Sequence, residues 1–284
     1  MKPMRTLVTL ALCTLLAAGC SAVSVIYNNA PSYLAGELED AFDLDDAQSA
    51  ELDRRMQEFF VWHRREELAL YQQFLEEAAL NAADGISAEE FLEFVDGLRT
   101  AFRRLMTRAI VDFSDMGLTL TPGQIDHYEQ YFREISADYR DYLEKSPQQR
   151  EIYRVDRAIE RMERWFGSFD RNQLDMLESR LRELPEFYEA WIRFREERQQ
   201  AFIATLRAAP TAGIDNRHLE NILLDPDTEY ARAFYRERDA YWQAYAIIIE
   251  DLSDMLSKKQ RKHLVKRLQK YSSAFEELVE DDQF

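Results

Sequence analysis

The chain has 284 residues, of which 46% are hydrophobic and 12% aromatic, and its formal net charge is −17. This composition supplies enough apolar side chains for a folded core and excludes an intrinsically disordered chain. The acidic balance argues against nucleic acid as a partner, because a negatively charged surface repels a phosphate backbone.

The N-terminus has the layout of a bacterial secretory signal peptide over residues 1–19. Two basic residues precede an apolar run over residues 7–16, which is too short to remain as a membrane-spanning helix. Small residues at 17–19 then lead directly to Cys20. This stretch resembles a bacterial lipobox, in which the cysteine is acylated and becomes the new N-terminus. It differs from the commonest form, because Leu16 stands one position earlier than the usual leucine, and an ordinary cleavage site is the alternative.

Cysteine usage agrees with a lipid anchor. Cys13 lies in the segment to be removed, so Cys20 is the only thiol of the mature chain and no intramolecular disulfide can form. Loss of Lys2 and Arg5 with the signal takes the net charge from −17 to −19. Acyl chains on Cys20, palmitate among them, are expected to hold the protein on a membrane, since each buried methylene contributes about 0.8 kcal/mol. The resemblance to lipoproteins implies, from Ser21, an outer-membrane location facing the periplasm of the cell envelope.

The rest of the chain predicts an all-α fold, an elongated multi-helix bundle of long amphipathic helices. Only eight Gly and seven Pro occur, and apolar residues recur at spacings of three and four. Residues 20–31 are expected to be the lipidated cysteine and a short tether. Residues 32–284 form the predicted helical domain, whose two halves would divide near residues 145–147. The predicted helices cover residues 32–42, 45–80, 87–114, 121–144, 147–167, 170–183, 186–208, 215–223 and 227–281, the last broken at Ser257.

A short motif recurs four times, as an apolar residue, then Asp, Thr or Ser, two variable positions and Gln. The copies run from Leu44 to Gln48, from Leu120 to Gln124, from Phe169 to Gln173 and from Leu256 to Gln260. The motif is a capping box, in which the Asp, Thr or Ser side chain and the Gln side chain each accept a hydrogen bond from the other residue's backbone N–H. Apolar residues follow each Gln at plus four, eight and eleven, so each copy predicts a helix start with one buried face. Variant starts are predicted at Ser87 and Ser146.

Several features carry a family resemblance. They are Tyr27, residues 42–48, the Trp62, His63, Arg64 run with Glu67, Leu68 and Tyr71 after it, and residues 165–167. With these features the chain resembles a family of Gram-negative envelope lipoproteins known only as a domain of unknown function. The resemblance implies an envelope location and a helical fold, and it implies no mechanism.

A second resemblance concerns the helix start that contains Leu120, Thr121 and Gln124. It is similar to the Leu-Thr-x-x-Gln motif of periplasmic stress chaperones. Capping chemistry alone can select such a motif. A chaperone-like holder of unfolded exported proteins therefore stays open as an alternative function.

His63 and Glu67 lie one turn apart on the predicted long helix and could form a hydrogen-bonded pair or share a metal. Structural pairing is favoured, because the chain has only four His and lacks the paired Glu-x-x-His motif of di-iron bundles. The sequence has no nucleophile elbow, no Gly-rich phosphate loop and no Cys and His metal spacing. We therefore expect no catalytic residue, no metal and no cofactor.

Two basic stretches are candidate sites for an anionic partner. The first places four guanidinium groups on one helix face, at Arg154, Arg157, Arg161 and Arg164, and neighbouring acids at 156, 160 and 163 could instead neutralise them. The second has no acid between Lys258 and Lys270, and its candidate residues are Lys258, Lys262, Lys266 and Arg267. These cations could meet acidic lipid or could neutralise acidic neighbouring helices. The predicted function is a lipid-anchored helical scaffold or binding module for an envelope protein or lipid, without catalysis.

Overall fold

The computed structural model describes the backbone of residues 20–281 and the side chains from residue 23 onward. The predicted signal peptide, residues 1–19, and the side chain of Cys20 lie outside the described residues. Between residues 20 and 281 the chain is α-helical without a strand, which confirms the predicted fold class. No helix within these residues is both long enough and apolar enough to cross a membrane.

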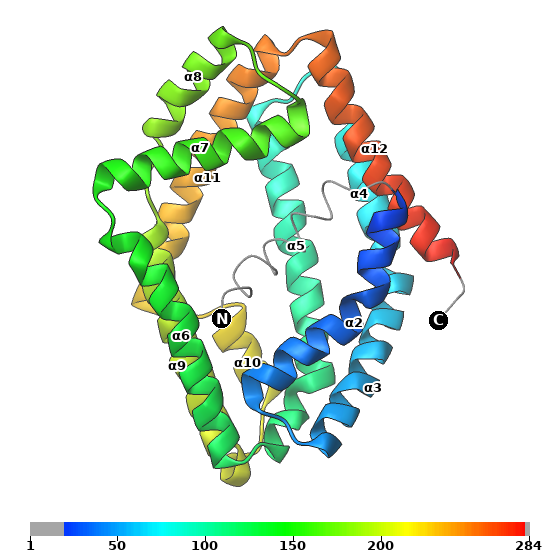
Figure 1. Ribbon diagram of the computed structural model, residues 1–284, viewed down its shortest axis with the longest axis vertical. Helices are drawn as coiled ribbons and strands as arrows, with labels where there is room; N and C mark the ends of the chain where they lie inside the picture. Colours follow the sequence, from blue (N-terminus) through cyan, green and yellow to red (C-terminus); the bar gives the residue numbers. More distant parts are fainter. Residues whose placement is uncertain (1–19, 282–284) are drawn as a thin grey trace.

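The helices follow one another with short connections (Figure 1). In chain order they are α2 (Cys20–Phe42), α3 (Asp46–Trp62), α4 (Leu68–Asn81), α5 (Ala88–Phe113), α6 (Pro122–Glu144), α7 (Pro147–Phe166), α8 (Arg171–Arg182), α9 (Tyr188–Ala212), α10 (Asn216–Leu223), α11 (Glu229–Met255) and α12 (Lys258–Glu280). A π-helical turn, His63–Glu67, joins α3 to α4, and a 3-10 helix, Ser114–Thr119, follows α5. The capping boxes start these helices because each one satisfies backbone N–H groups that have no partner inside the helix.

The first helix begins 12 residues earlier than the sequence predicted, and the expected tether over residues 20–31 is its first half. Val23 is 1% exposed and packs with Tyr27 in a cluster that includes residues of α3 and α12. Burial of this face outweighs Pro31, which removes one backbone hydrogen bond from the helix interior. The chain is therefore attached to the folded body from the fourth residue of α2 onward.

The hydrophobic cores combine segments from both sides of the turn at residues 145–147. One cluster brings Ala79 of α4 together with Met162 of α7 and Leu264 of α12. A second cluster brings Val23 of α2 together with Leu278 of α12. The turn therefore does not separate two self-contained cores. In Figure 1, α3 and α6 begin near the lower end of the molecule, whereas α8 and α12 begin near the upper end.

Candidate functional site

The four Gln-ended capping boxes that follow an apolar residue meet in two pairs, each formed by helix starts that are distant in sequence; the box at Ser146 and Gln149 is not part of a pair among residues 23–281. In the first pair, the Gln124 side-chain amide donates to Oε1 of Gln48 at 2.5 Å, and the Gln48 amide donates to Oε1 of Gln124 at 3.3 Å. The same two amides also donate to the carbonyl oxygens of Asp43 and Thr119, both at 2.9 Å. We call this reciprocal pair the first glutamine clasp. It joins the start of α3 to the start of α6.

The second glutamine clasp repeats this arrangement at the other end of the molecule. Gln173 and Gln260 donate to each other at 3.1 Å and 2.9 Å. Gln173 also donates to the carbonyl oxygen of Met255 at 2.9 Å, and Gln260 to that of Ser168 at 3.0 Å. In both clasps, each glutamine donates to the carbonyl oxygen of the residue that lies two positions before the N-cap of the partner glutamine's helix. The second clasp thus joins the start of α8 to the start of α12.

Each clasp needs glutamine rather than glutamate. The Gln oxygen accepts from its own N-cap N–H and from the partner amide, and the Gln nitrogen donates twice, so the amide group uses its full hydrogen-bonding capacity. A carboxylate would cap the helix equally well but has no N–H to donate. Ser87 and Glu90 form such a carboxylate box, and no clasp is described there. Glutamine at the last position of all four motif copies was the sequence signal for the clasps. The sequence analysis interpreted these glutamines only as helix caps.

The two clasps differ in the charge that surrounds them. The first lies beside a hollow lined by Asp43, Asp126 and Glu129, with Arg133 and His127, and we call this region the acidic corner. The second lies beside a hollow of about 400 Å³ lined by Lys259, Lys262, Lys266 and His263, with the capping residue Asp170, and we call it the cationic corner. Relative to the clasp glutamine, Lys262 occupies the position of Asp126, and His263 that of His127. The same local scaffold therefore carries opposite charges.

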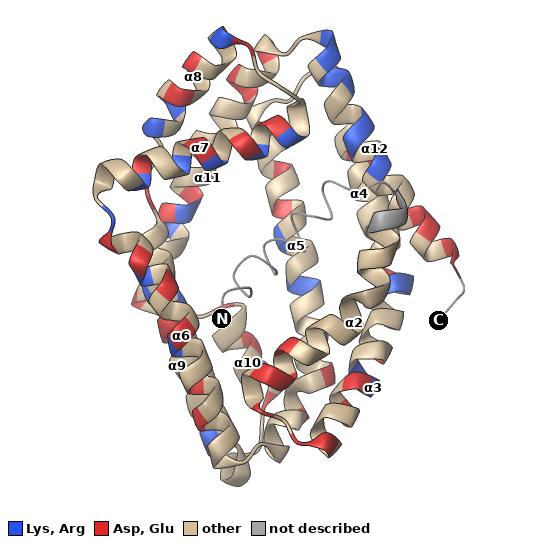
Figure 2. Ribbon diagram, viewed as in Figure 1, with Lys and Arg blue, Asp and Glu red and all other residues tan. Residues whose placement is uncertain are grey.

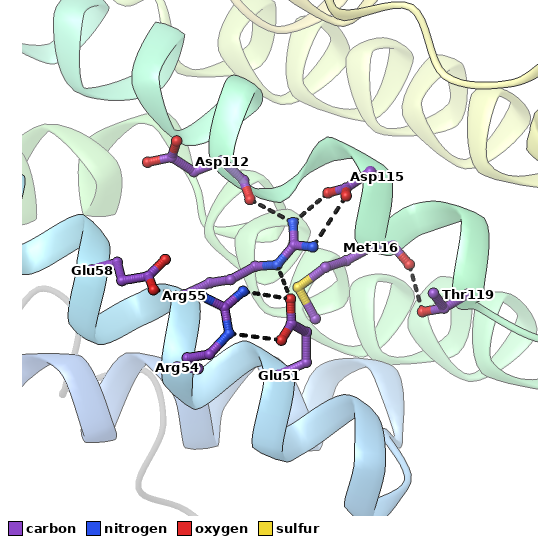
Figure 3. A network of polar contacts seen from close by, with 8 residues as sticks. All are labelled: Glu51, Arg54, Arg55, Glu58, Asp112, Asp115, Met116 and Thr119. Carbon is purple, nitrogen blue, oxygen red and sulfur yellow. Dashed lines mark hydrogen bonds and ion pairs between the residues drawn. The ribbon is translucent and has the colours of Figure 1, made fainter.

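Basic side chains near the first clasp are neutralised by ion pairs (Figure 3). The Arg55 guanidinium reaches from α3 to Asp115 in the 3-10 helix and donates to the carbonyl oxygen of Asp112 at 2.8 Å. Arg54 lies 2.7 Å from the Glu51 carboxylate, which Arg55 also contacts. Hydrogen bonds from these two arginines lower the pKa of Glu51 to about 2.

The lysines of the cationic corner have no such partners. Lys258, Lys259, Lys262 and Lys266 are exposed, and none forms an ion pair with any residue between 23 and 281. Figure 2 shows Lys and Arg along the first half of α12 and acidic residues at its end. The first turn of α12 contains no acidic residue, although the positive end of a helix favours acids over lysines. The predicted alternative, neutralisation by acidic neighbouring helices, has no close ion pair to support it among residues 23–281.

Arg267, the remaining predicted cation of α12, lies elsewhere. Its guanidinium is 5.4 Å from the ring centre of Trp165 and 5.9 Å from that of Tyr271. It therefore packs against aromatic rings of the body and does not line the hollow. The sequence analysis included Arg267 and missed Lys259 and His263, because spacing along the helix alone does not show which side faces the start of α8.

The predicted arginine stripe on α7 is turned back onto the protein. Arg154 lies 3.5 Å from Glu186 and Arg157 lies 2.9 Å from Glu160. The other two predicted residues donate to backbone carbonyl oxygens of α7 itself, Arg161 at 3.1 Å and Arg164 at 3.4 Å. The four arginines thus have partners within the protein. The alternative, neutralisation by the acids at 156, 160 and 163, agrees with the structure only for Arg157 and Glu160.

His63 and Glu67 do not form the predicted pair. His63 Nδ1 lies 2.8 Å from the Tyr27 hydroxyl, whereas the Glu67 carboxylate accepts three hydrogen bonds from Arg104, two at 2.9 Å and one at 3.2 Å. The π-helical turn is the physical reason, because its i→i+5 hydrogen bonding puts more residues in each turn and moves residues i and i+4 out of the alignment that an α-helix gives them. Burial lowers the pKa of His63 to about 4, so its ring is neutral at pH 7.

Glu67 remains a buried carboxylate. Burial acts to raise its pKa, but hydrogen bonds from Arg104 and Tyr71 outweigh that effect and hold the pKa below its ordinary value. Arg64 is also buried and donates to Asn28 and to the carbonyl oxygen of Leu278, which ties α2 to the end of α12. These groups are satisfied within the fold, and no three His, Cys, Asp or Glu side chains converge on a metal-sized site in the described chain.

Comparison with known proteins gives a family for this chain. The model of a family of unknown function, DUF6279, matches residues 40–236, which is more than half of the chain. The cationic corner's lysines on α12 lie beyond the matched segment. The chain matches no curated protein and no solved structure. The protein thus belongs to the family of unknown function DUF6279.

Proposed function

We propose that this protein is a lipid-anchored helical module of the bacterial envelope that binds an anionic partner through the cationic corner. The observation that carries the proposal is the set of exposed lysines on α12 without ion-pair partners in residues 23–281. On a chain of net charge −17, whose arginines form many ion pairs, this set is a concentrated positive surface. Such a surface attracts anionic groups and excludes cationic ones.

The start of α2 supports the anchoring part of the proposal. Only two residues, Ser21 and Ala22, separate Cys20 from the buried Val23. In the α-helix, three successive steps rise about 4.5 Å along the axis. Acyl chains on Cys20 would therefore hold the folded body close to the bilayer, with α2 and α12 nearest to the point of attachment.

The anchoring part is tested by comparing the native protein with Cys20→Ala in cells. We expect the native protein to incorporate labelled palmitate and to fractionate with outer membranes, and Cys20→Ala to be unlabelled and released. In-cell crosslinking followed by mass spectrometry then identifies the partner, and its capture is expected to depend on the anchor. A native protein that carries no label, or that stays membrane-bound after Cys20→Ala, would contradict this part.

A chaperone-like holder of unfolded exported proteins is the second candidate. The observation in its favour is that α5 leaves large apolar side chains in solvent, with Leu98 50% and Phe102 56% exposed. The test is whether the purified protein slows aggregation of a reduced, unfolded exported protein at equal molar ratio. Leu98→Ser with Phe102→Ser is expected to abolish that effect, and Leu98→Met with Phe102→Leu is the matched control.

A further inference from the structure

The cationic corner combines three features that favour a small, highly charged anion. Lys259, Lys262 and Lys266 follow one face of α12 and line one hollow together with the ring of His263. The hollow of about 400 Å³ is large enough for a phosphate or diphosphate group with its contacts. Ammonium groups and a histidine N–H can donate charge-assisted hydrogen bonds to phosphate oxygens.

The backbone adds to the same field. Both α8 and α12 begin at this hollow, each without an acidic residue in its first turn. Aligned peptide dipoles give each helix start a partial positive charge. Asp170 is the one acid that lines the hollow, and its Oδ1 is used to accept the backbone N–H of Gln173 at 3.0 Å. The clasp amides are likewise occupied by each other, so the lysines and His263 are the groups left for a ligand.

The acidic corner shows that the clasp itself does not require these lysines. There the same glutamine geometry is built with Asp126 in place of Lys262, and Asp126 forms an ion pair with Arg207 at 2.8 Å. Gly123 stands in place of Lys259, and Gln130 in place of Lys266. The lysines are therefore additional to the structural motif, and Lys259, in the first turn of α12, lies where the helix dipole disfavours a cation.

We infer that the cationic corner is a binding site for a phosphate-bearing ligand, held by Lys259, Lys262 and Lys266 with His263 against it. The inference deepens the proposed function and rests on it only for the biological source of the phosphate. That source is either a phospholipid head group or a free phosphate compound, and the two share the chemistry that the site recognises.

The test uses the full chain from residue 20 with Cys20→Ala, so that no acyl chain contributes to binding. The chain has four His, and the ring resonances of His263 and His127 report on the two corners in one NMR spectrum. Pyrophosphate is titrated at constant ionic strength, with chloride as the control anion. In parallel, the protein is sedimented with phosphatidylcholine vesicles that contain or lack phosphatidylglycerol.

We expect a saturable shift of His263 with pyrophosphate and no comparable shift of His127. The variant Lys262→Glu with Lys266→Glu should weaken binding by about tenfold or more, because two charge-assisted contacts are lost. The matched control is Arg193→Glu with Arg232→Glu, which makes the same change in net charge on exposed arginines of α9 and α11 and should retain binding. All variants are compared by circular dichroism to confirm that the helices remain.

The pyrophosphate titration and the vesicle sedimentation distinguish the two sources of phosphate. Saturable pyrophosphate binding supports a free phosphate ligand, and lysine-dependent sedimentation with phosphatidylglycerol alone supports a lipid head group. Equal shifts of His263 and His127, or no lysine-dependent binding in either arm, would overturn the inference. Failure here would leave the anchoring test with Cys20→Ala unaffected, because that test reads acylation and localisation in cells.

Discussion

The two glutamine clasps are the same local structure in two different electrostatic settings. Both join helix starts that are more than 70 residues apart in sequence by the same reciprocal amide pair. At the acidic corner, cations such as Arg55 and Arg207 are tied to carboxylates. At the cationic corner, lysines stand free of ion pairs with the described residues. The comparison shows which residues build the scaffold and which are added to it, because the glutamines, their caps and one histidine position are common to both corners, whereas the lysines are not.

The largest expected difference between the corners lies in burial of the clasp. Gln173 is 2% exposed, whereas Gln48 is partly solvent-accessible. Gln173→Leu removes the donor to the Met255 carbonyl and both hydrogen bonds that the buried Gln173 shares with Gln260, and we expect it to lower the free energy of unfolding by about 3 kcal/mol. Gln48→Leu should cost about 1 kcal/mol, because water can replace part of its bonds.

Urea unfolding followed by circular dichroism measures both changes. Gln149→Leu is the matched control, since Gln149 is exposed and belongs to a capping box that starts α7 outside either clasp. If Gln173→Leu lowered the free energy of unfolding by no more than Gln149→Leu does, the clasp would contribute no stability beyond that of the helix cap.

The loops that lead into the two clasps differ in backbone strain. Gly167, before the second clasp, has φ +83° and ψ −175°, a region that side chains avoid. Gly167→Ala should therefore destabilise by about 1–3 kcal/mol, although a Cβ there would meet only His263 at 3.9 Å. Asp43, before the first clasp, has φ +51°, and Asp43→Gly should stabilise by about 0.5 kcal/mol.

Thermal unfolding of the two variants is the measurement. Gly36→Ala serves as the control, because Gly36 lies inside α2 with open space around its Cβ position and should gain about 0.5–1 kcal/mol. If Gly167→Ala were as stable as Gly36→Ala, the positive φ would not explain the glycine at this turn.

The ion-pair network makes the stability of the acidic corner depend on pH in the acid range. The pKa of Glu51 is lowered to about 2 and that of Asp115 is also lowered, in both cases mainly by hydrogen bonds from arginine. A folded-state pKa below the unfolded value contributes stability that is present above about pH 4.5 and is lost as the pH falls toward 2. Arg55→Met should cost below about 1 kcal/mol at pH 7, because its partners are largely exposed.

Chemical denaturation at pH 7, 4 and 2.5 tests the sign. The difference in the free energy of unfolding between the native protein and Arg55→Met should become smaller as the pH falls. Lys262→Met, at the cationic corner, should show a difference that does not vary over this range, because no carboxylate of the described residues pairs with Lys262. A constant difference for Arg55→Met would mean that Arg55 contributes by packing alone.

The smallest expected effect comes from exchanging charges at equivalent positions of the two corners. Lys262→Asp places an acid just past the first turn of α12, where the helix dipole acts weakly, and should stabilise by at most about 0.3 kcal/mol. Asp126→Lys removes the ion pair with Arg207 and should destabilise by about 0.5 kcal/mol. Both effects should shrink in 1 M salt, where charges are screened within about 3 Å. Destabilisation by Lys262→Asp would assign this lysine a structural role and weaken the phosphate inference.

Much of the fold could be predicted from the sequence because helix starts are local. A capping box and the apolar spacing after it lie within about 15 residues, so the beginnings of α3, α5, α6, α7, α8 and α12 were predicted within one residue of their caps. The start of α2 was missed because its helical state depends on burial against α3 and α12. The π-helical turn was missed for a similar reason, since its residues are held by Tyr27, Asn28 and Arg104 from other helices.

The candidate site divides in the same way. The sequence by itself determined that the first half of α12 carries lysines without acids and that four glutamines start helices, because both are properties of neighbouring residues. Only the tertiary structure decided that the glutamines pair two by two, that Lys259 and His263 join Lys262 and Lys266 around one hollow, and that Arg267 does not. Which glutamines pair and which side chains face the hollow depend on the positions of helices that are distant in sequence. Hydrophobic burial across the whole chain sets those positions.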